Sequence, residues 1–125
     1  MIGIYINNKE HHVTAIFDGL KTVETRTRRA AAALVAAGVV PGAVVAIISR
    51  SYVVGLVKVL ALIDYQSEQE FKADFERHRV APGSCYGFDP SRGKTGFVLG
   101  DPVRVPPYPV PKQKRPTSFI ALNGH

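Results

Sequence analysis

The segment from Gly19 to Arg26 holds three charged side chains, Lys21, Glu24 and Arg26, directly after a glycine that ends a helical pattern. Alternate residues of a β-strand share a face, so Thr22, Glu24 and Arg26 are predicted to point to the same side. Lys21 lies at the junction of helix and strand, where the turn can direct its ammonium to that side as well. Two cations and one carboxylate in a cleft can bind an anionic or polar planar ligand, with bidentate hydrogen bonds from the arginine. The alternative is an ordinary surface salt bridge, worth about 0–1 kcal/mol.

A second polar segment, Ser49-Arg50-Ser51-Tyr52, separates two strongly apolar runs. If this turn lies at the rim of the cleft, Arg50 is placed to contact a phosphate and Tyr52 to stack on a base. A plain hairpin turn explains the same residues. Near the end of the chain a basic patch suits either contact with a nucleic-acid backbone or a solvated connector: Lys112, Lys114 and Arg115.

The remaining candidates for chemistry give weaker predictions. His11 and His12 are adjacent, so on a helix they point about 100° apart and are poorly placed to share a metal. A base and acid pair of His12 and His78 requires the fold to bring them together, and solvated surface histidines are the simpler interpretation. We therefore expect no metal and no cofactor. Gly93-Lys94-Thr95 lacks the spacing of a phosphate-binding loop, which leaves Lys94 as an exposed lysine near a hairpin.

Hydrophobic periodicity and turn signals predict the elements that must position these residues. Helices are expected over 9–18, 28–37 and 67–78, the last two opened by Thr27 and Ser67 as capping residues. The third is acidic, and Phe71 and Phe75 are expected to face inward. Strands are expected over 1–6, 21–26, 43–49, 53–63, 96–99, 103–105 and 118–122, with a bend or bulge at Gly55. Residues 80–94 are interpreted as a long loop, 100–102 as a turn, and the prolines of 106–111 as a connector outside the sheet.

Composition sets broad limits on the class of protein. Of 125 residues 46% are hydrophobic and 21% charged, as in an ordinary globular domain, and we expect 1–125 to form a single domain. The net charge of +6 favours an anionic partner, RNA first, with solubilising surface charge as the alternative. No leader is expected, because the first residues lack a basic segment and a long apolar core. No membrane span is expected, because Gly38, Pro41 and Gly42 interrupt the long uncharged stretch. One cysteine, Cys85, excludes an internal disulfide and fits a cytoplasmic location.

The octapeptide Gly19-Leu20-Lys21-Thr22-Val23-Glu24-Thr25-Arg26 resembles the Gly-x-Lys-x-x-Glu-x-Arg signature of the ASCH (activating-signal-cointegrator homology) family. The helix before it, the strand containing 54–57 with its Ser67-led helix, and the tail 94–109 also fit that family. The resemblance implies an α+β fold: a small PUA-like mixed β-barrel with two to three inserted helices and a cleft floored by the signature. It also implies binding of RNA or modified nucleosides.

Some small members of that family hydrolyse N4-acetylcytidine, and this chain departs from their pattern at two places. Glu24 stands where they carry a threonine thought to act as the nucleophile. They also carry a glutamate soon after the acidic helix, whereas 78–84 contain no acid here. Acyl transfer through a hydroxyl at position 24 is therefore impossible in this chain.

Three hypotheses of function follow. The first is an RNA- or nucleotide-binding domain in which Glu24 accepts from a base amino edge and Lys21 and Arg26 meet carbonyl or phosphate oxygens. The second is a hydrolase of RNA or a modified nucleoside, with Lys21 and Glu24 as general base and acid and Arg26 stabilising negative charge. The third is a protein-interaction module built on Pro106 to Pro111. The identity of the ligand and the oligomeric state are left open.

Overall fold

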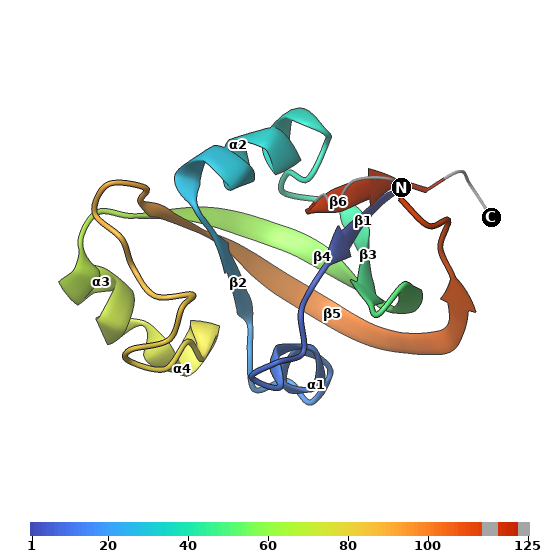
Figure 1. The fold of residues 1–125 in the computed structure, drawn as a ribbon, viewed down its shortest axis with the longest axis horizontal. Helices are drawn as coiled ribbons and strands as arrows, with labels where there is room; N and C mark the ends of the chain where they lie inside the picture. Colours follow the sequence, from blue (N-terminus) through green and yellow to red (C-terminus); the bar gives the residue numbers. More distant parts are fainter. Residues whose placement is uncertain (114–117, 123–125) are drawn as a thin grey trace.

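A six-stranded mixed sheet forms the centre of the computed structural model, which describes residues 1–113 and 118–122. Lys114 and Arg115 of the predicted basic patch lie outside these described residues. The strand order is β2-β5-β4-β3-β1-β6, with short helices around the sheet (Figure 1). In chain order the elements are β1 (Ile2–Tyr5), α1 (His12–Phe17), β2 (Val23–Arg26), α2 (Arg28–Ala36), β3 (Val44–Ser49), β4 (Tyr52–Tyr65), α3 (Glu68–Ala73), α4 (Phe75–His78), β5 (Lys94–Pro109) and β6 (Phe119–Ala121). The predicted α+β class is confirmed.

The sheet is curved but not closed. β1 pairs in parallel with β3, and the other neighbouring pairs are antiparallel. Strand twist accumulates along β4 and β5, the two longest strands, which sweep together across the molecule (Figure 1). β2 and β6 end the strand order and are not hydrogen-bonded to each other within the described residues. The domain therefore has the predicted small, mixed, barrel-like sheet, which stays open between β2 and β6 in the described residues.

The main core lies between the sheet and helices α1 and α2. Thr27 caps α2 by accepting a hydrogen bond from the Ala30 N–H at 3.3 Å, and the helix buries Ala31 and Leu34. The register of β4 shifts next to Gly55, as predicted, and a Cβ at this position would collide with the Phe17 ring. α1 is consequently held against the sheet, which fixes where the chain enters β2.

β5 runs without interruption from Lys94 to Pro109, so the predicted turn at 100–102 and the proline connector are wrong. Beyond Val98 only β4 pairs with β5 among the described residues, so its outer edge needs no N–H donors and tolerates proline. Register shifts against β4 accommodate two prolines and one residue with a positive φ. Pro106 and Pro107 fall between two paired positions, and Asp101, with φ of 51°, falls between two others.

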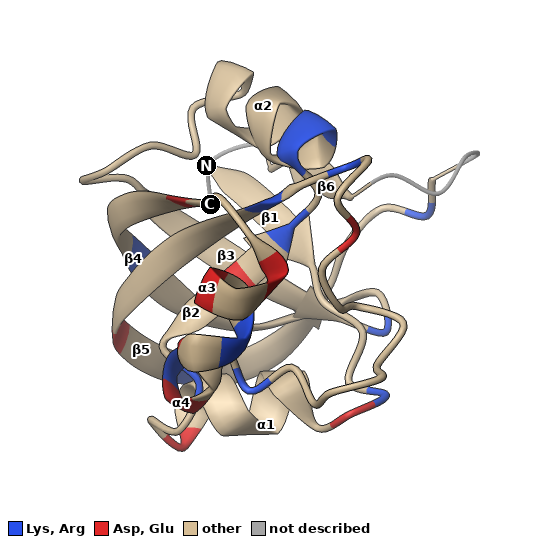
Figure 2. Ribbon diagram, turned by 90° about the vertical axis from the view of Figure 1, so that its left-hand side faces the viewer, with Lys and Arg blue, Asp and Glu red and all other residues tan. Residues whose placement is uncertain are grey.

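The acidic helical segment is split at Asp74 into α3 and α4. The Asp74 carboxylate accepts hydrogen bonds from the Tyr65 hydroxyl at 2.5 Å and from Arg77 at 2.6 Å. Phe71 is buried against Tyr65, but Phe75 is 38% exposed, which corrects its predicted inward orientation. Acidic and basic side chains are intermixed on α3 and α4 (Figure 2), so this surface is largely neutralised by its own ion pairs.

The residues that the structure describes contain neither a cluster of metal-ligating side chains nor a helix suited to crossing a membrane. No three His, Cys, Asp or Glu side chains in that part of the chain are grouped to hold a metal ion. None of its helices combines the length and apolar character that crossing a membrane requires.

Candidate functional site

Lys21, Glu24 and Arg26 converge, with Glu24 and Arg26 on one face of β2 and Lys21 directed to them by the turn before the strand. The Glu24 carboxylate lies between the two cations, 3.5 Å from the Lys21 Nζ and 3.0 Å from an Arg26 guanidinium nitrogen. The same guanidinium donates to the Tyr5 carbonyl at 2.8 Å, and the Lys21 ammonium donates to the His78 carbonyl. All three side chains are largely buried, with Lys21 only 2% exposed. The triad is therefore an internal network rather than a surface salt bridge.

Local structure fixes this arrangement from both sides. α1 ends at Phe17, and Gly19, just after its C-cap Asp18, has a φ of 78°, the left-handed conformation that glycine adopts most easily. The Lys21 N–H then donates back to the Ala15 carbonyl at 3.0 Å, which turns the chain into β2. β2 pairs antiparallel with β5, so Glu24 lies opposite Phe97 and Arg26 opposite Thr95. The charged side chains thus stand on an edge strand between a helix end and a long central strand.

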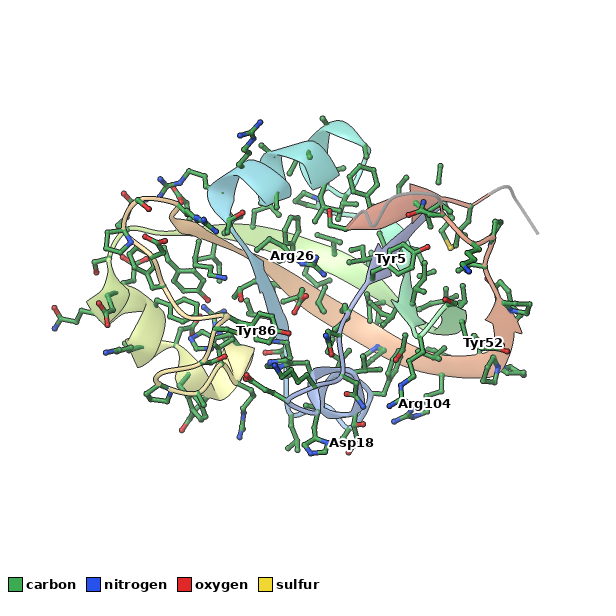
Figure 3. All side chains as sticks on the ribbon, viewed as in Figure 1. Tyr5, Asp18, Arg26, Tyr52, Tyr86 and Arg104 are labelled. Atoms are coloured by element: carbon green, nitrogen blue, oxygen red, sulfur yellow. The ribbon has the colours of Figure 1, made fainter. Side chains whose placement is uncertain are left out.

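These side chains open into a hollow of about 330 Å³. Its wall is formed by β2, the β1–α1 connection, the start of β5 and the loop after α4; the lining residues include Tyr5, His12, Lys21, Glu24, Arg26, Cys85, Tyr86 and Lys94. In Figure 3 Arg26 lies between Tyr86 and Tyr5 in the view, at the centre of this face. The hollow combines two aromatic side chains with a charged floor.

The electrostatics of the hollow favour a negatively charged or electron-rich ligand. Lys21, Arg26 and Lys94 face one carboxylate, Glu24, which leaves an excess of two positive charges. Burial lowers the pKa of Lys21 and of Lys94 by penalising the ammonium form, and Glu24 opposes that effect in both. Burial alone would raise the pKa of Glu24, but Arg26 and Lys21 outweigh it and the net pKa is lowered. Glu24 is therefore ionised at neutral pH.

His12 is buried in the hollow, so its expected place on the solvated surface is wrong. His12 is only 6% exposed, yet neither of its ring nitrogens makes a hydrogen bond among the described residues. The nearest carboxylate, that of Glu10, lies 3.5 Å from its Nε2 without hydrogen-bond geometry. Burial and the Lys21 ammonium lower the pKa of His12, which keeps the imidazole neutral at neutral pH. The Nε of Arg26 is a third buried and unpaired polar atom in the same place.

His78 is also buried, but its ring is fully engaged elsewhere. Its Nδ1 accepts from the Val80 N–H at 2.9 Å, and its Nε2 lies 2.6 Å from the Phe71 carbonyl, to which it donates. The ring stacks on Phe71 with centroids 4.1 Å apart. A base and acid pair of His12 and His78 is therefore not formed, because both nitrogens of His78 are occupied and it does not line the hollow.

Three other predicted ligand-binding residues lie outside this hollow. Thr22 precedes β2, where its backbone bonds to Arg77 and Leu99, and it is not part of the lining. Arg50 lines a neighbouring hollow instead. Tyr52 begins β4 and is 48% exposed, and Figure 3 shows it far from Tyr86, beside the last part of β5.

Sequence reasoning missed Lys94 and Tyr86 as well as His12. Lys94 is 6% exposed rather than solvated, because the pairing of β5 with β2 brings it beside Glu24. Tyr86 approaches the His12 ring edge-on, with centroids 5.7 Å apart. Only the length of the loop 80–94 signalled a functional role, and nothing in the local pattern distinguished Lys94 from a surface lysine.

The loop after α4 is anchored over the hollow by a hydrogen-bond chain. The Ser84 hydroxyl donates to the Glu10 carboxylate at 2.8 Å, and the Tyr86 N–H donates to the Ser84 oxygen at 3.1 Å. Cys85, between them, is exposed and lines the hollow. The loop therefore contributes an aromatic wall whose position depends on Glu10.

Together the fold and the hollow define a class: an α+β domain with an open curved sheet and a charged pocket beside an edge strand. The crystal structure of ASCH from Zymomonas mobilis has this fold, with a TM-score of 0.69 and 20% identity over 98% of this chain and 87% of that chain. A mutant of the Zymomonas mobilis protein gives 0.71 and 19% identity over 98% and 89%. Hypothetical protein PH0355 is less similar, at 0.53 and 17% identity over 81% of this chain and 99% of its own. No protein-family model and no curated protein matches the chain. The chain has the ASCH fold, as the resemblance of residues 19–26 implied.

Proposed function

We propose that the chain binds RNA or a nucleotide, with one base held in the hollow of Lys21, Glu24 and Arg26. One observation carries the proposal. Both ring nitrogens of His12 and the Nε of Arg26 are buried without hydrogen-bond partners among the described residues, and both side chains line this hollow. An unpaired buried polar atom costs about 1–3 kcal/mol, so a ligand that supplies the missing partners recovers that free energy.

The chemistry of the hollow suits a base with an attached phosphate. Glu24 accepts from an exocyclic amino group, Arg26 and Lys94 donate to carbonyl or phosphate oxygens, and neutral His12 can do either. Tyr5 and Tyr86 supply ring surface of the kind on which single-stranded bases stack. At about 330 Å³ the hollow is at the low end of the roughly 300–1,000 Å³ typical of small-molecule pockets, which favours one base over a larger ligand.

The test is a binding screen of nucleosides, 5′-mononucleotides and short single-stranded RNAs against the wild type and Glu24→Gln. Glutamine keeps the shape but removes the charge and one acceptor, and we expect affinity to fall about tenfold or more. Lys58→Gln is the matched control, because Lys58 is exposed on β4 outside the hollow. Circular dichroism checks that each variant is folded. No binding to the wild type, or equal losses in Glu24→Gln and Lys58→Gln, contradicts the proposal.

A hydrolase acting on RNA or a modified nucleoside in the same hollow is the second candidate, and His12 is the observation that favours it. A neutral imidazole with free nitrogens is a suitable proton acceptor at neutral pH. Lys21, the base expected from the sequence, instead donates to the His78 carbonyl and faces Glu24. Turnover that disappears in His12→Gln while binding persists supports this reading; binding without turnover supports the first.

We further propose that residues 1–125 act as one domain in the cytoplasm. β1 and β6, from the two ends of the described chain, pair in the same sheet, which ties the termini into one structural unit. The single exposed cysteine fits a reducing compartment.

A further inference from the structure

A second hollow adjoins the first across the β1–α1 connection. It measures about 640 Å³ and is lined by Tyr5, Ile6, Asn7, Asn8, Lys9, Ile48, Ser49, Arg50 and Ser51. Three of these residues, Tyr5, Ile6 and Asn7, also line the hollow of Lys21 and Glu24. Figure 1 shows the connection descending from β1 to α1 with β2 on one side and the β3–β4 turn on the other. The two hollows therefore share one wall and form neighbouring compartments.

The second hollow has the charge and donors of a phosphate site. Lys9 and Arg50 are exposed, and no ion pair holds either of them within the described residues. The lining contains no carboxylate, in contrast to the first hollow with Glu24. Ser49 and Ser51 add hydroxyls. The side-chain oxygens of Asn7 and Asn8 already accept backbone N–H groups, so their amide nitrogens are the ends that can donate to a ligand. Such a set recognises phosphate and sugar without reading a base.

The turn that presents Arg50 is held in an unfavourable backbone conformation. Arg50 and Ser51 have φ values of 51° and 70°, the left-handed region that the two-residue hairpin turn requires and that Asn and Gly normally occupy. Non-glycine residues there carry strain, and such strain gathers at ligand clamps. This turn places Arg50 in the lining of the hollow. Asn or Gly would adopt the same backbone conformation with less strain than Arg50 and Ser51 do.

We infer that the two hollows bind consecutive nucleotides of a single-stranded RNA, the base of one beside Glu24 and the adjacent phosphate beside Lys9 and Arg50. The inference rests on the proposed function and specifies its ligand class as a polynucleotide rather than a free nucleoside. The shared wall makes the two compartments contiguous, and the absence of acids from the second lets it accept the connecting phosphate. Arg50 therefore binds the strand, as its sequence position suggested, but in its own compartment.

The experiment compares the affinity of a 5′-mononucleotide with that of the dinucleotide carrying the same base and one more phosphate. In the wild type the dinucleotide is expected to bind at least about tenfold more tightly, because it adds charge-assisted bonds to the second hollow. Arg50→Gln and Lys9→Gln are each expected to lower the ratio of dinucleotide to mononucleotide affinity about tenfold. Each should also reduce the slope of log dinucleotide affinity against log salt concentration by about one. Lys58→Gln removes the same charge outside both hollows and serves as the control.

Each result decides between the two proposals. A mononucleotide that binds through Glu24 while the dinucleotide binds no more tightly overturns this inference and leaves the proposed function intact. A dinucleotide advantage that Lys58→Gln reduces as much as Arg50→Gln also overturns it, because the second hollow then has no special role. Failure of both ligands to bind overturns the proposed function and the inference with it.

Discussion

His12 and His78 are both buried histidines, yet they differ in whether their ring nitrogens are hydrogen-bonded. Each nitrogen of His78 meets a backbone partner, and its ring stacks on Phe71. His12 is nearly as inaccessible, but neither of its nitrogens makes a hydrogen bond in the described part of the chain, although the Glu10 carboxylate lies 3.5 Å from its Nε2. Burial alone therefore does not distinguish a core histidine from a ligand-binding one. The count of satisfied hydrogen bonds does, because proteins seldom bury polar atoms without a partner unless a ligand or water supplies one.

The largest effect is expected from His78→Ala. It removes the ring that stacks on Phe71 and leaves the Val80 N–H and the Phe71 carbonyl without their partner. The combined cavity and lost hydrogen bonds should lower the free energy of unfolding by about 3 kcal/mol or more. Urea denaturation followed by circular dichroism measures the change. A loss below about 1 kcal/mol would mean that His78 is not the structural member of the pair.

Lys21→Met tests the residue that contacts both the His78 backbone and the carboxylate of Glu24 in the hollow. Lys21 donates to the His78 carbonyl and pairs with Glu24, so the substitution leaves a buried carbonyl unpaired and Glu24 with Arg26 as its direct partner. We expect a loss of about 2 kcal/mol in unfolding free energy together with weaker nucleotide binding. Denaturation and binding titrations on the same preparation provide both values. Unchanged stability would show that Lys21 serves the hollow alone.

His12→Phe should change stability by no more than about 1 kcal/mol, in either direction, because no hydrogen bond is lost and two unpaired polar atoms are removed. Nucleotide affinity should nevertheless fall about tenfold. Isothermal titration calorimetry and urea denaturation separate the two effects. A destabilisation as large as that of His78→Ala would show that His12 has a structural partner after all.

The smallest effect is a dependence on pH. Burial lowers the pKa of His12 and of His78 in the folded protein, so the unfolded chain takes up protons first as the pH falls through about 6.5. Stability should therefore be lost as the pH falls from 7.5 through that value. His12→Phe should reduce this loss, because it removes one of the two buried imidazoles whose pKa is lowered. Urea midpoints across this pH interval give the slopes, and a steeper slope in His12→Phe would contradict the assignment.

Local signals in the sequence predicted those parts of the fold that depend on neighbouring residues. The alternation of Glu24 and Arg26, the stop at Gly19 and the caps at Thr27 and Ser67 are all present. These features follow from backbone geometry within a few residues, so a single sequence suffices to predict them.

The rest of the structure depends on pairing between distant segments. Pro106 and Pro107 argued against a strand, but β5 has an unpaired outer edge there and a register shift that accommodates them. His12 and Lys94 looked like surface residues, since their burial arises only when α1 and β5 meet β2. Arg50 lines a neighbouring hollow rather than the signature hollow, and this separation depends on where the β1–α1 connection runs.

The pairing of β2 with β5 also has a consequence for how the protein folds. Val23 lies opposite Val98, so the signature strand finds its neighbour only after almost the whole intervening chain has been arranged. Closing so large a loop loses conformational entropy before stabilising contacts form, and chains rich in such distant pairings fold slowly. Glu24 and Lys94 should therefore come together late, and a nascent chain released before β5 emerges would carry the full signature yet have no ligand affinity.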